Sequence, residues 1–198
     1  MLPKIDPHKL IGHNEHGEVY SGRVTRSGLL LDVLNPEPEQ IDIRDIAAGL
    51  AYQGRFTGQT SEYYSVAAHS ILVSYLVPPE LALYGLLHDA SEAYLNDISR
   101  PVKLQLGPEY KIMEERVMYA ICTRFKLHKW LMAFVKPADN VAVCLEQKIL
   151  LPDVPAWPHA LTDTEYSVIM RDFGLTFIHN IQPDTARQIF LARFEELT

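Results

Sequence analysis

From Ile41 onward, segment after segment carries apolar residues at three- and four-residue steps, the spacing of amphipathic and buried helices. IRDIAAGLAY, YSVAAHSILVSYLV and ELALYGLLHDASEAYL come first, and Pro78 and Pro79 separate the second from the third. EYKIMEERVMYAICTRF, AFVKPADNVAVCLEQKILL, TDTEYSVIMRDF and DTARQIFLARFEEL follow. The succession predicts a mainly α fold, a helical bundle with breaks at 96–101 and 152–158.

Two short β-prone runs precede the helices. EVYSGRV and LLLDVL flank the glycine-containing turn TRSG, and NPEP follows the second run. We therefore expect a small β-hairpin over 18–34, a helical core over 41–150 and two C-terminal helices over 160–197. The length of the chain suits a single domain over 1–198.

Charge and composition narrow the class of partner. A net charge of −7 argues against a nucleic-acid surface, but a small phosphorylated ligand needs only a few cations or a metal. No apolar run approaches the roughly 20 residues of a membrane span, and the N-terminus lacks a signal-peptide core. Cys122 and Cys144 share no close spacing, so no disulfide framework is expected. These features predict a cytoplasmic protein without membrane or nucleic-acid partners, and they are compatible with a homo-oligomer.

The pair His88 and Asp89 follows the apolar run YGLL, which belongs inside a bundle. A lone histidine on an apolar helix is more often a packed core residue than a ligand. A buried carboxylate, however, is costly unless it is paired or metal-bound, and imidazole with carboxylate suits a divalent ion. In a continuous helix Glu92 would share a face with both residues, close enough to exchange a proton with metal-bound water.

Further ligands must come from other helices. His69, on the preceding helix, is the natural third ligand. Asp139, in VKPADNVAV, interrupts an apolar face and is the candidate from the far side. Pro137 either begins that helix or kinks it, and Asp139 alone would be read as a charge at a helix N-terminus.

The order of these residues on successive helices resembles the HD-domain phosphohydrolase superfamily. HDASEAYLNDISRPVK closely resembles the bacterial 5′-deoxynucleotidases and the related phage dATP triphosphohydrolases, and the similarity covers about 41–150. The segments that carry it are HDASEAYLNDISRPVK, RF at 55–56, SVAAHS at 65–70 and KPAD at 136–139. One departure is Ala68, where relatives often carry Glu; this removes no ligand but changes its support.

The resemblance implies metal ligands at His69, His88, Asp89 and Asp139, acids that handle the attacking water at Glu92 and Asp97, and substrate contacts at Arg55, Phe56 and Lys103. Each supporting residue has a plainer alternative. Arg55 and Lys103 would otherwise be surface cations, Asp97 a helix cap and Phe56 a core residue.

The implied activity is metal-dependent hydrolysis at the 5′ phosphoester of a deoxynucleotide, either a monophosphate or a triphosphate such as dATP. Adenine is preferred by analogy alone. The ligand set would accept one Zn, Mn, Co, Fe or Ni ion, with Mg on the substrate phosphates as a further option. The alternatives are an alarmone hydrolase, disfavoured because Ala93 replaces a second acid after Glu92, and a non-catalytic nucleotide-binding scaffold. Cyclic-dinucleotide cleavage would call for a GYP-type motif, which the sequence lacks.

Overall fold

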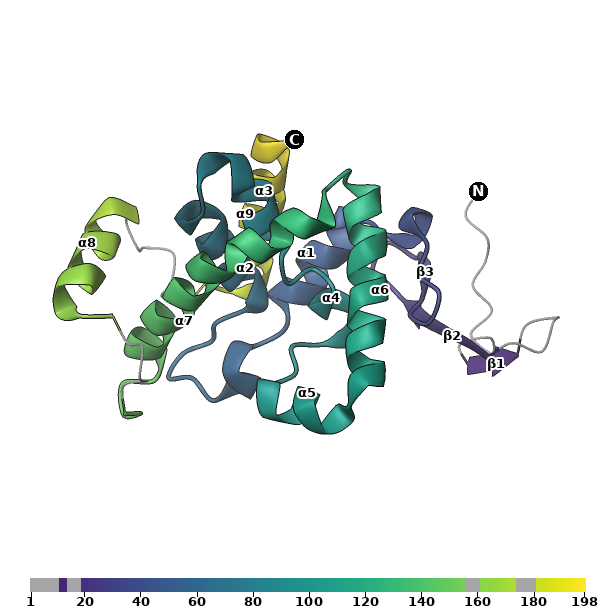
Figure 1. The fold of residues 1–198 in the computed structure, drawn as a ribbon, viewed down its shortest axis with the longest axis horizontal. Helices are drawn as coiled ribbons and strands as arrows, with labels where there is room; N and C mark the ends of the chain where they lie inside the picture. Colours follow the sequence, from purple (N-terminus) through teal and green to yellow (C-terminus); the bar gives the residue numbers. More distant parts are fainter. Residues whose placement is uncertain (1–10, 14–18, 156–160, 174–180) are drawn as a thin grey trace.

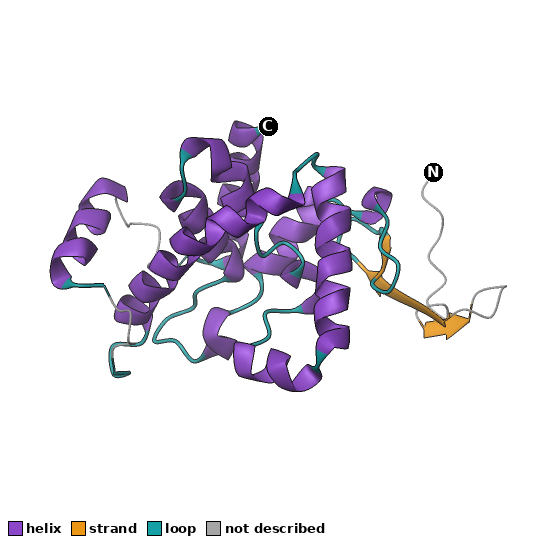
Figure 2. Ribbon diagram, in the orientation of Figure 1, coloured by secondary structure: helices purple, strands orange, loops and turns teal. Residues whose placement is uncertain are grey.

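The computed structural model describes residues 11–13, 19–155, 161–173 and 181–198. Helices pack into a bundle, and a small antiparallel sheet lies at its edge near the N-terminus (Figure 1 and Figure 2). The mainly α class with a small N-terminal β element is therefore confirmed. Within the described ranges, no helix has the length and apolar character needed to cross a membrane.

The sheet is antiparallel throughout. Its strands, in spatial order, are β1 (Ile11–His13), β2 (Val19–Val24) and β3 (Leu30–Asp32). The second and third form the expected hairpin, whereas the sequence pattern did not predict the first. Gly28 takes a φ of 85° in the turn, and Ser27 donates from its backbone N and its Oγ to the Asp45 carboxylate, both at 2.6 Å. These bonds tie the hairpin to the first helix.

Nine α-helices lie within the described residues, and side chains cap the first two of them. The α-helices are α1 (Ile43–Ala51), α2 (Val66–Leu76), α3 (Ala82–Leu87), α4 (Glu92–Leu95), α5 (Arg100–Leu106), α6 (Pro108–Arg124), α7 (Lys136–Leu150), α8 (Asp163–Phe173) and α9 (Pro183–Leu197). Short 3-10 helices are η2 (Pro38–Gln40), η3 (Arg55–Gly58), η4 (Pro79–Leu81) and η5 (Lys129–Val135). Asp42 caps α1 by accepting from the Arg44 N–H, and Ser65 caps α2 by accepting from the Ala68 N–H.

The expected continuous helix over 80–95 is wrong. The α-helix stops at Leu87, and four residues of turn separate it from α4. In this turn Ala90 N–H donates to Leu87 O at 3.1 Å and Glu92 N–H to Asp89 O at 2.9 Å, three residues back rather than four. The apolar pattern is compatible with both hydrogen-bonding schemes, so it did not reveal the break. The break after α4 is also shorter than expected, because α5 begins at Arg100.

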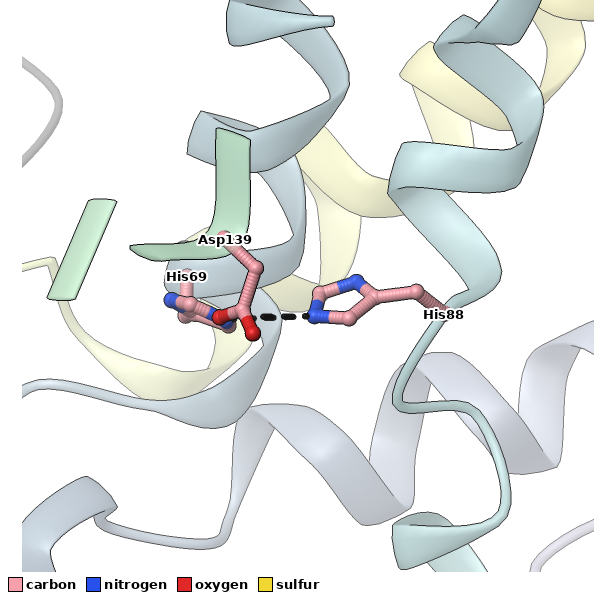
Figure 3. A group of neighbouring side chains, drawn as sticks. All are labelled: His69, His88 and Asp139. Carbon is pink, nitrogen blue, oxygen red and sulfur yellow. Dashed lines mark hydrogen bonds and ion pairs between the residues drawn. The ribbon is translucent and has the colours of Figure 1, made fainter. Parts of the chain in front are cut away.

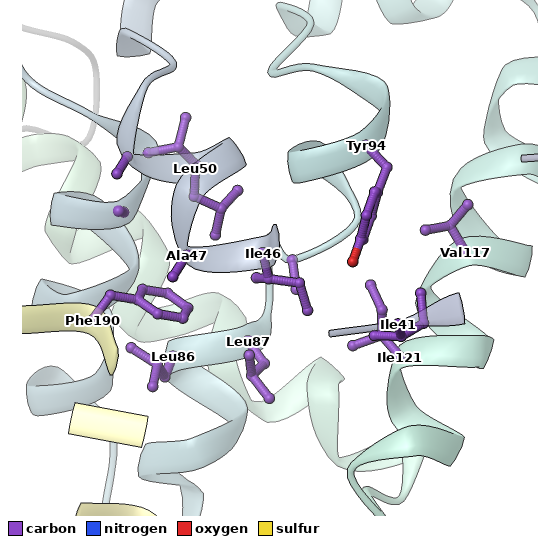
Figure 4. Close-up of a cluster of buried hydrophobic side chains, with 14 of the residues drawn as sticks. Ile41, Ile46, Ala47, Leu50, Leu86, Leu87, Tyr94, Val117, Ile121 and Phe190 are labelled. Atoms are coloured by element: carbon purple, nitrogen blue, oxygen red, sulfur yellow. The ribbon is translucent and has the colours of Figure 1, made fainter. Parts of the chain in front are cut away.

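Helix α2 is the central element of the bundle, and it separates two apolar clusters. One side of it, with Val66 and Ile71, packs into a cluster that includes Leu87 and Phe190 (Figure 4). The other side, with Leu72, packs into a second cluster beside α7. Nearly every α2 side chain is buried, so the polar residues on this helix, His69 among them, are shielded from solvent.

Candidate metal centre and active site

His69 and His88 meet because α2 and α3 approach each other closely. At Gly85 a Cβ would lie 2.9 Å from the Cα of Ser74, so only glycine allows this contact. The Nδ1 of His88 lies 2.8 Å from Gly85 O; Nδ1–H therefore donates to this carbonyl, and Nε2 points toward α2. The side chain of His69 is fully buried.

His69, His88 and Asp139 form a group whose potential ligand atoms all lie within 4.8 Å of one another (Figure 3). The Nε2 of His69 is 3.3 Å from the Nε2 of His88 and 3.2 Å from the Oδ1 of Asp139. Asp139 lies in the first turn of α7, which begins at Lys136 with Pro137 inside its first turn, so Pro137 starts the helix and does not kink it. This group could hold a metal ion.

Asp89, the fourth expected ligand, lies at the same place. Its Oδ2 is 3.1 Å from the Nε2 of His88 and 3.5 Å from the Nε2 of His69. Burial raises the pKa of Asp89, but the adjacent imidazoles and Arg55 lower it by more than burial raises it. The net pKa of Asp89 is therefore well below its usual range. Burial also raises the pKa of Asp139, but the two histidines lower it by more, so its net pKa lies below the usual value. Two imidazole nitrogens with two ionised carboxylates fit a divalent transition metal.

Glu146 contacts His69 on the side of the imidazole that faces away from His88 and Asp139. Its side chain has no exposed surface, and its Oε1 lies 2.6 Å from the Nδ1 of His69. The same carboxylate accepts hydrogen bonds from the hydroxyl of Tyr64 and the Nε of Arg55, each at 3.0 Å. Burial and the Arg55 charge lower the pKa of His69, but Glu146 and Asp139 outweigh them and raise it to about 9. The site is therefore built to hold positive charge.

Arg55 is a buried residue, so the alternative of a surface cation is wrong. Its guanidinium pairs with Glu146, and its Nη1 lies 3.8 Å from the Oδ2 of Asp89, one of the expected metal ligands. Phe56 follows it in a left-handed conformation, with a φ of 52°, and the guanidinium lies 5.4 Å from its ring centroid. Phe56 is half-buried against the second apolar cluster, as a core residue would be. Left-handed backbone in a non-glycine residue is strained, and such strain gathers at functional turns.

Glu92 and Asp97 lie close to Asp89, one of the expected metal ligands. Because residues 89–92 form a 3-10 turn, Asp89 and Glu92 lie one above the other. Burial, and then the charges of Asp89 and Asp97, raise the pKa of Glu92 to about 9. Burial also raises the pKa of Asp97. Asp97 does not cap the following helix, because Ser99 occupies that position.

Lys103 contacts carboxylates in this structure. Its Nζ donates to Glu92 at 3.2 Å and to Glu114 at 2.7 Å, and its side chain remains partly exposed. Glu114, on α6, was not predicted as part of the site. A phosphate-binding role for Lys103 therefore stays a prediction, and it requires the Nζ to exchange or share these partners.

Comparison with known proteins finds no matching family model. The chain is 37% identical to the uncharacterized protein YfdR of Escherichia coli K12 over 164 residues, which cover 81% of this chain and 86% of the relative. It is 34% identical to the uncharacterized protein RCAP_rcc00048 of Rhodobacter capsulatus over 184 residues, 86% of this chain and 92% of the relative. The chain belongs to the YfdR family.

Membership of the YfdR family brings no activity with it, since both relatives are uncharacterized. The site of this YfdR-family chain also contains residues that sequence reasoning missed. Glu146 had a usable signal, because it falls seven residues after Asp139, two turns along the same face of α7, in an apolar stretch. Tyr64 had no such signal in the sequence, because a single tyrosine just before a helix does not indicate a role in a site.

Proposed function

We propose that this chain is a metal-dependent phosphohydrolase of the HD type that cleaves the 5′ phosphoester of a deoxynucleotide. The observation that carries the proposal is the position of Glu92. This buried acid, with a pKa raised to about 9, stands one 3-10 turn after Asp89, whose carboxylate lies against the imidazoles of His69 and His88. Strongly perturbed acids beside a potential metal site are typical of catalytic centres.

His69, His88, Asp89 and Asp139 would hold one divalent ion. Bound there, the ion would supply positive charge toward a phosphate oxygen and lower the pKa of water. The chain's own acids then move the protons. Either Glu92 or Asp97 accepts a proton as water adds to phosphorus, and the other supplies one to the departing oxygen as the P–O bond breaks.

Cations around the site favour a phosphorylated substrate. Arg55 is held beside Asp89, and Lys103 lies beside Glu92, so both can offset negative charge that accumulates on phosphate oxygens. The choice of a deoxynucleotide rests on the resemblance of HDASEAYLNDISRPVK to 5′-deoxynucleotidases and dATP triphosphohydrolases. A monophosphate would yield nucleoside and phosphate, whereas a triphosphate would yield nucleoside and tripolyphosphate.

A nucleotide panel tests this function. Deoxy- and ribonucleoside mono- and triphosphates and an alarmone are incubated with metal-free protein plus Mn, Co, Zn, Fe or Ni. Bound nucleotide and released phosphate, pyrophosphate and tripolyphosphate are measured. We expect turnover of at least one deoxynucleotide, its loss in Glu92→Gln and its retention in Glu115→Gln, an exposed glutamate on α6. Nucleotide binding without turnover under every metal would reject the hydrolase in favour of the scaffold. Release of pyrophosphate from an alarmone, with no deoxynucleotide turnover, would favour the alarmone hydrolase.

A further inference from the structure

The side chain of Gln53 joins the two segments that carry the proposed acids. Its Nε2 donates to Glu92 O at 2.9 Å and to Gly49 O at 3.0 Å, and its Oε1 accepts from the Asp97 N–H at 2.9 Å. Both amide hydrogens and the amide oxygen are therefore used. Two of these contacts, those with Glu92 O and the Asp97 N–H, reach the backbone of the two residues proposed as acids.

Helix α4 lies directly against α1 at this point and cannot approach it more closely. A Cβ at Gly49 would lie 2.7 Å from Ala93 O and 2.8 Å from the Cα of Ala93, so the two helices touch backbone to backbone. Gln53 lies four residues after Gly49 and bonds to its carbonyl. The close contact and the amide bonds thus act together on the segment that begins with Glu92.

The backbone between the two acids is strained. Asn96 has a φ of 71° and a ψ of 154°, a region that glycine occupies almost alone. Its N–H donates to Glu92 O at 2.8 Å, so that carbonyl accepts from both Asn96 and Gln53. Such a conformation persists only where the surroundings fix it, and the bond from Asp97 to Gln53 fixes the residue that follows.

Gln53 also connects to the metal side of the site through its backbone. Its carbonyl accepts from the Val66 N–H at 3.0 Å, at the start of the helix that carries His69. Two residues later, Arg55 N–H donates to Tyr64 O at 2.9 Å. These bonds do not use the side chain, so a substitution at Gln53 leaves them available.

We propose that Gln53 is a positioning residue, whose side-chain amide fixes Glu92 and Asp97 relative to the metal group. The inference rests on the proposed function, because it assigns the two acids their task. Proton transfer needs the acids within hydrogen-bond reach of the reacting atoms, and a misplacement of about 1 Å costs about 100-fold in rate. The Gln53 amide makes no hydrogen bond to a proposed metal ligand; Asp89, the nearest of them in sequence, joins this segment through the bond from Glu92 N–H to Asp89 O.

The test uses Gln53→Glu, which keeps the size but cannot donate to the two carbonyls, and Gln53→Ala, which adds no charge. Gln59→Glu, on an exposed glutamine in the same loop, is the matched control. We expect both Gln53 variants to lose about 10–100-fold in kcat, while KM and the Kd for Mn²⁺ stay near those of the wild type. Gly49→Ala, which pushes α4 away with Gln53 intact, should show the same pattern. A purely structural role would instead shift kcat, KM and metal affinity together.

A second readout is independent of activity. Amide exchange at Asn96 and Asp97 should be faster in Gln53→Ala, which removes the acceptor of the Asp97 N–H, than in the wild type, and unchanged in Gln59→Glu. Exchange as slow as in the wild type, in folded Gln53→Ala, would overturn the positioning role, as would a wild-type kcat. An inactive wild type would refute the proposed function alone, because the exchange comparison still decides whether Gln53 fixes this segment.

Discussion

The Nδ1 of His69 lies 2.6 Å from the Oε1 of Glu146, a carboxylate 77 residues away on α7. Because Nδ1 faces this carboxylate, Nε2 faces His88 and Asp139. Carboxylates in this position fix the tautomer and orientation of metal-binding histidines.

Replacing Glu146 by Gln should therefore weaken metal binding. Loss of such a supporting carboxylate typically costs about 10–100-fold in metal affinity. The measurement is calorimetric titration of metal-free protein with Mn²⁺. Tyr64→Phe is the control, because it removes one hydrogen bond from Glu146 and leaves the contact with His69. An unchanged Kd in folded Glu146→Gln would show that this carboxylate does not support the metal ligand.

Glu92→Gln should retain the metal and lose most of the turnover. General acid–base catalysis contributes about 10²–10⁴-fold, and an amide cannot exchange the proton. Steady-state kinetics and metal titration of the same preparation check this. Glu114→Gln loses the other carboxylate partner of Lys103 and should have a smaller effect. A near-wild-type kcat in Glu92→Gln would remove Glu92 from the chemistry.

Glu92 also makes the stability of the metal-free protein depend on pH. Burial and the neighbouring carboxylates raise its pKa from 4.5 to about 9 in the folded state, so between these values the folded state holds a proton that the unfolded state has lost. The contribution of Glu92 to stability therefore falls as pH rises through this window.

Glu92→Gln, which cannot ionise, should for this reason be more stable than the wild type at pH 8 and gain little at pH 4.5. One unit of pKa corresponds to about 1.4 kcal/mol, so the gain in Tm at pH 8 should reach at least about 2–4 °C. Thermal melts of metal-free protein at both pH values measure it, with Glu115→Gln as the control. A gain of equal size at both pH values would contradict the raised pKa.

Lys103→Met separates two roles for this lysine. If Nζ binds the outer phosphates, kcat/KM should fall by about 10-fold or more, and further for a triphosphate than for the matching monophosphate, because charge-assisted bonds contribute about 1.5–3 kcal/mol. Kinetics with both substrates test this, against Lys111→Met on the exposed face of α6. Equal losses on both substrates would indicate that Lys103 acts through Glu92 and Glu114.

Much of the fold was predictable because several helices bury apolar faces of regular period. Helices α1, α2 and α6 lie close to their predicted limits for this reason. Asp139 lies in the first turn of α7, as expected if Pro137 begins that helix. The turn at 88–91 was not predictable, since its local pattern suits a continuous helix equally well.

The supporting residues of the site escaped prediction for a different physical reason. Gln53 finds its partners 39 and 44 residues away, so nothing in its neighbourhood in sequence marks it. The resemblance singled out Arg55, but its burial depends on the carboxylate of Glu146, 91 residues away. Tertiary packing creates these roles, and local periodicity carries no information about them.

Turnover measured against metal content tests directly whether one bound ion is required for hydrolysis. Metal-free protein is reconstituted stepwise with Mn²⁺, and hydrolysis of the best deoxynucleotide from the panel is measured at each ratio of bound ion to chain. We expect no turnover without metal, a rise in proportion to occupancy and a plateau at about one ion per chain, all lost in His88→Ala. Turnover that is independent of bound metal, or its absence at full occupancy, would refute metal-dependent hydrolysis by this protein.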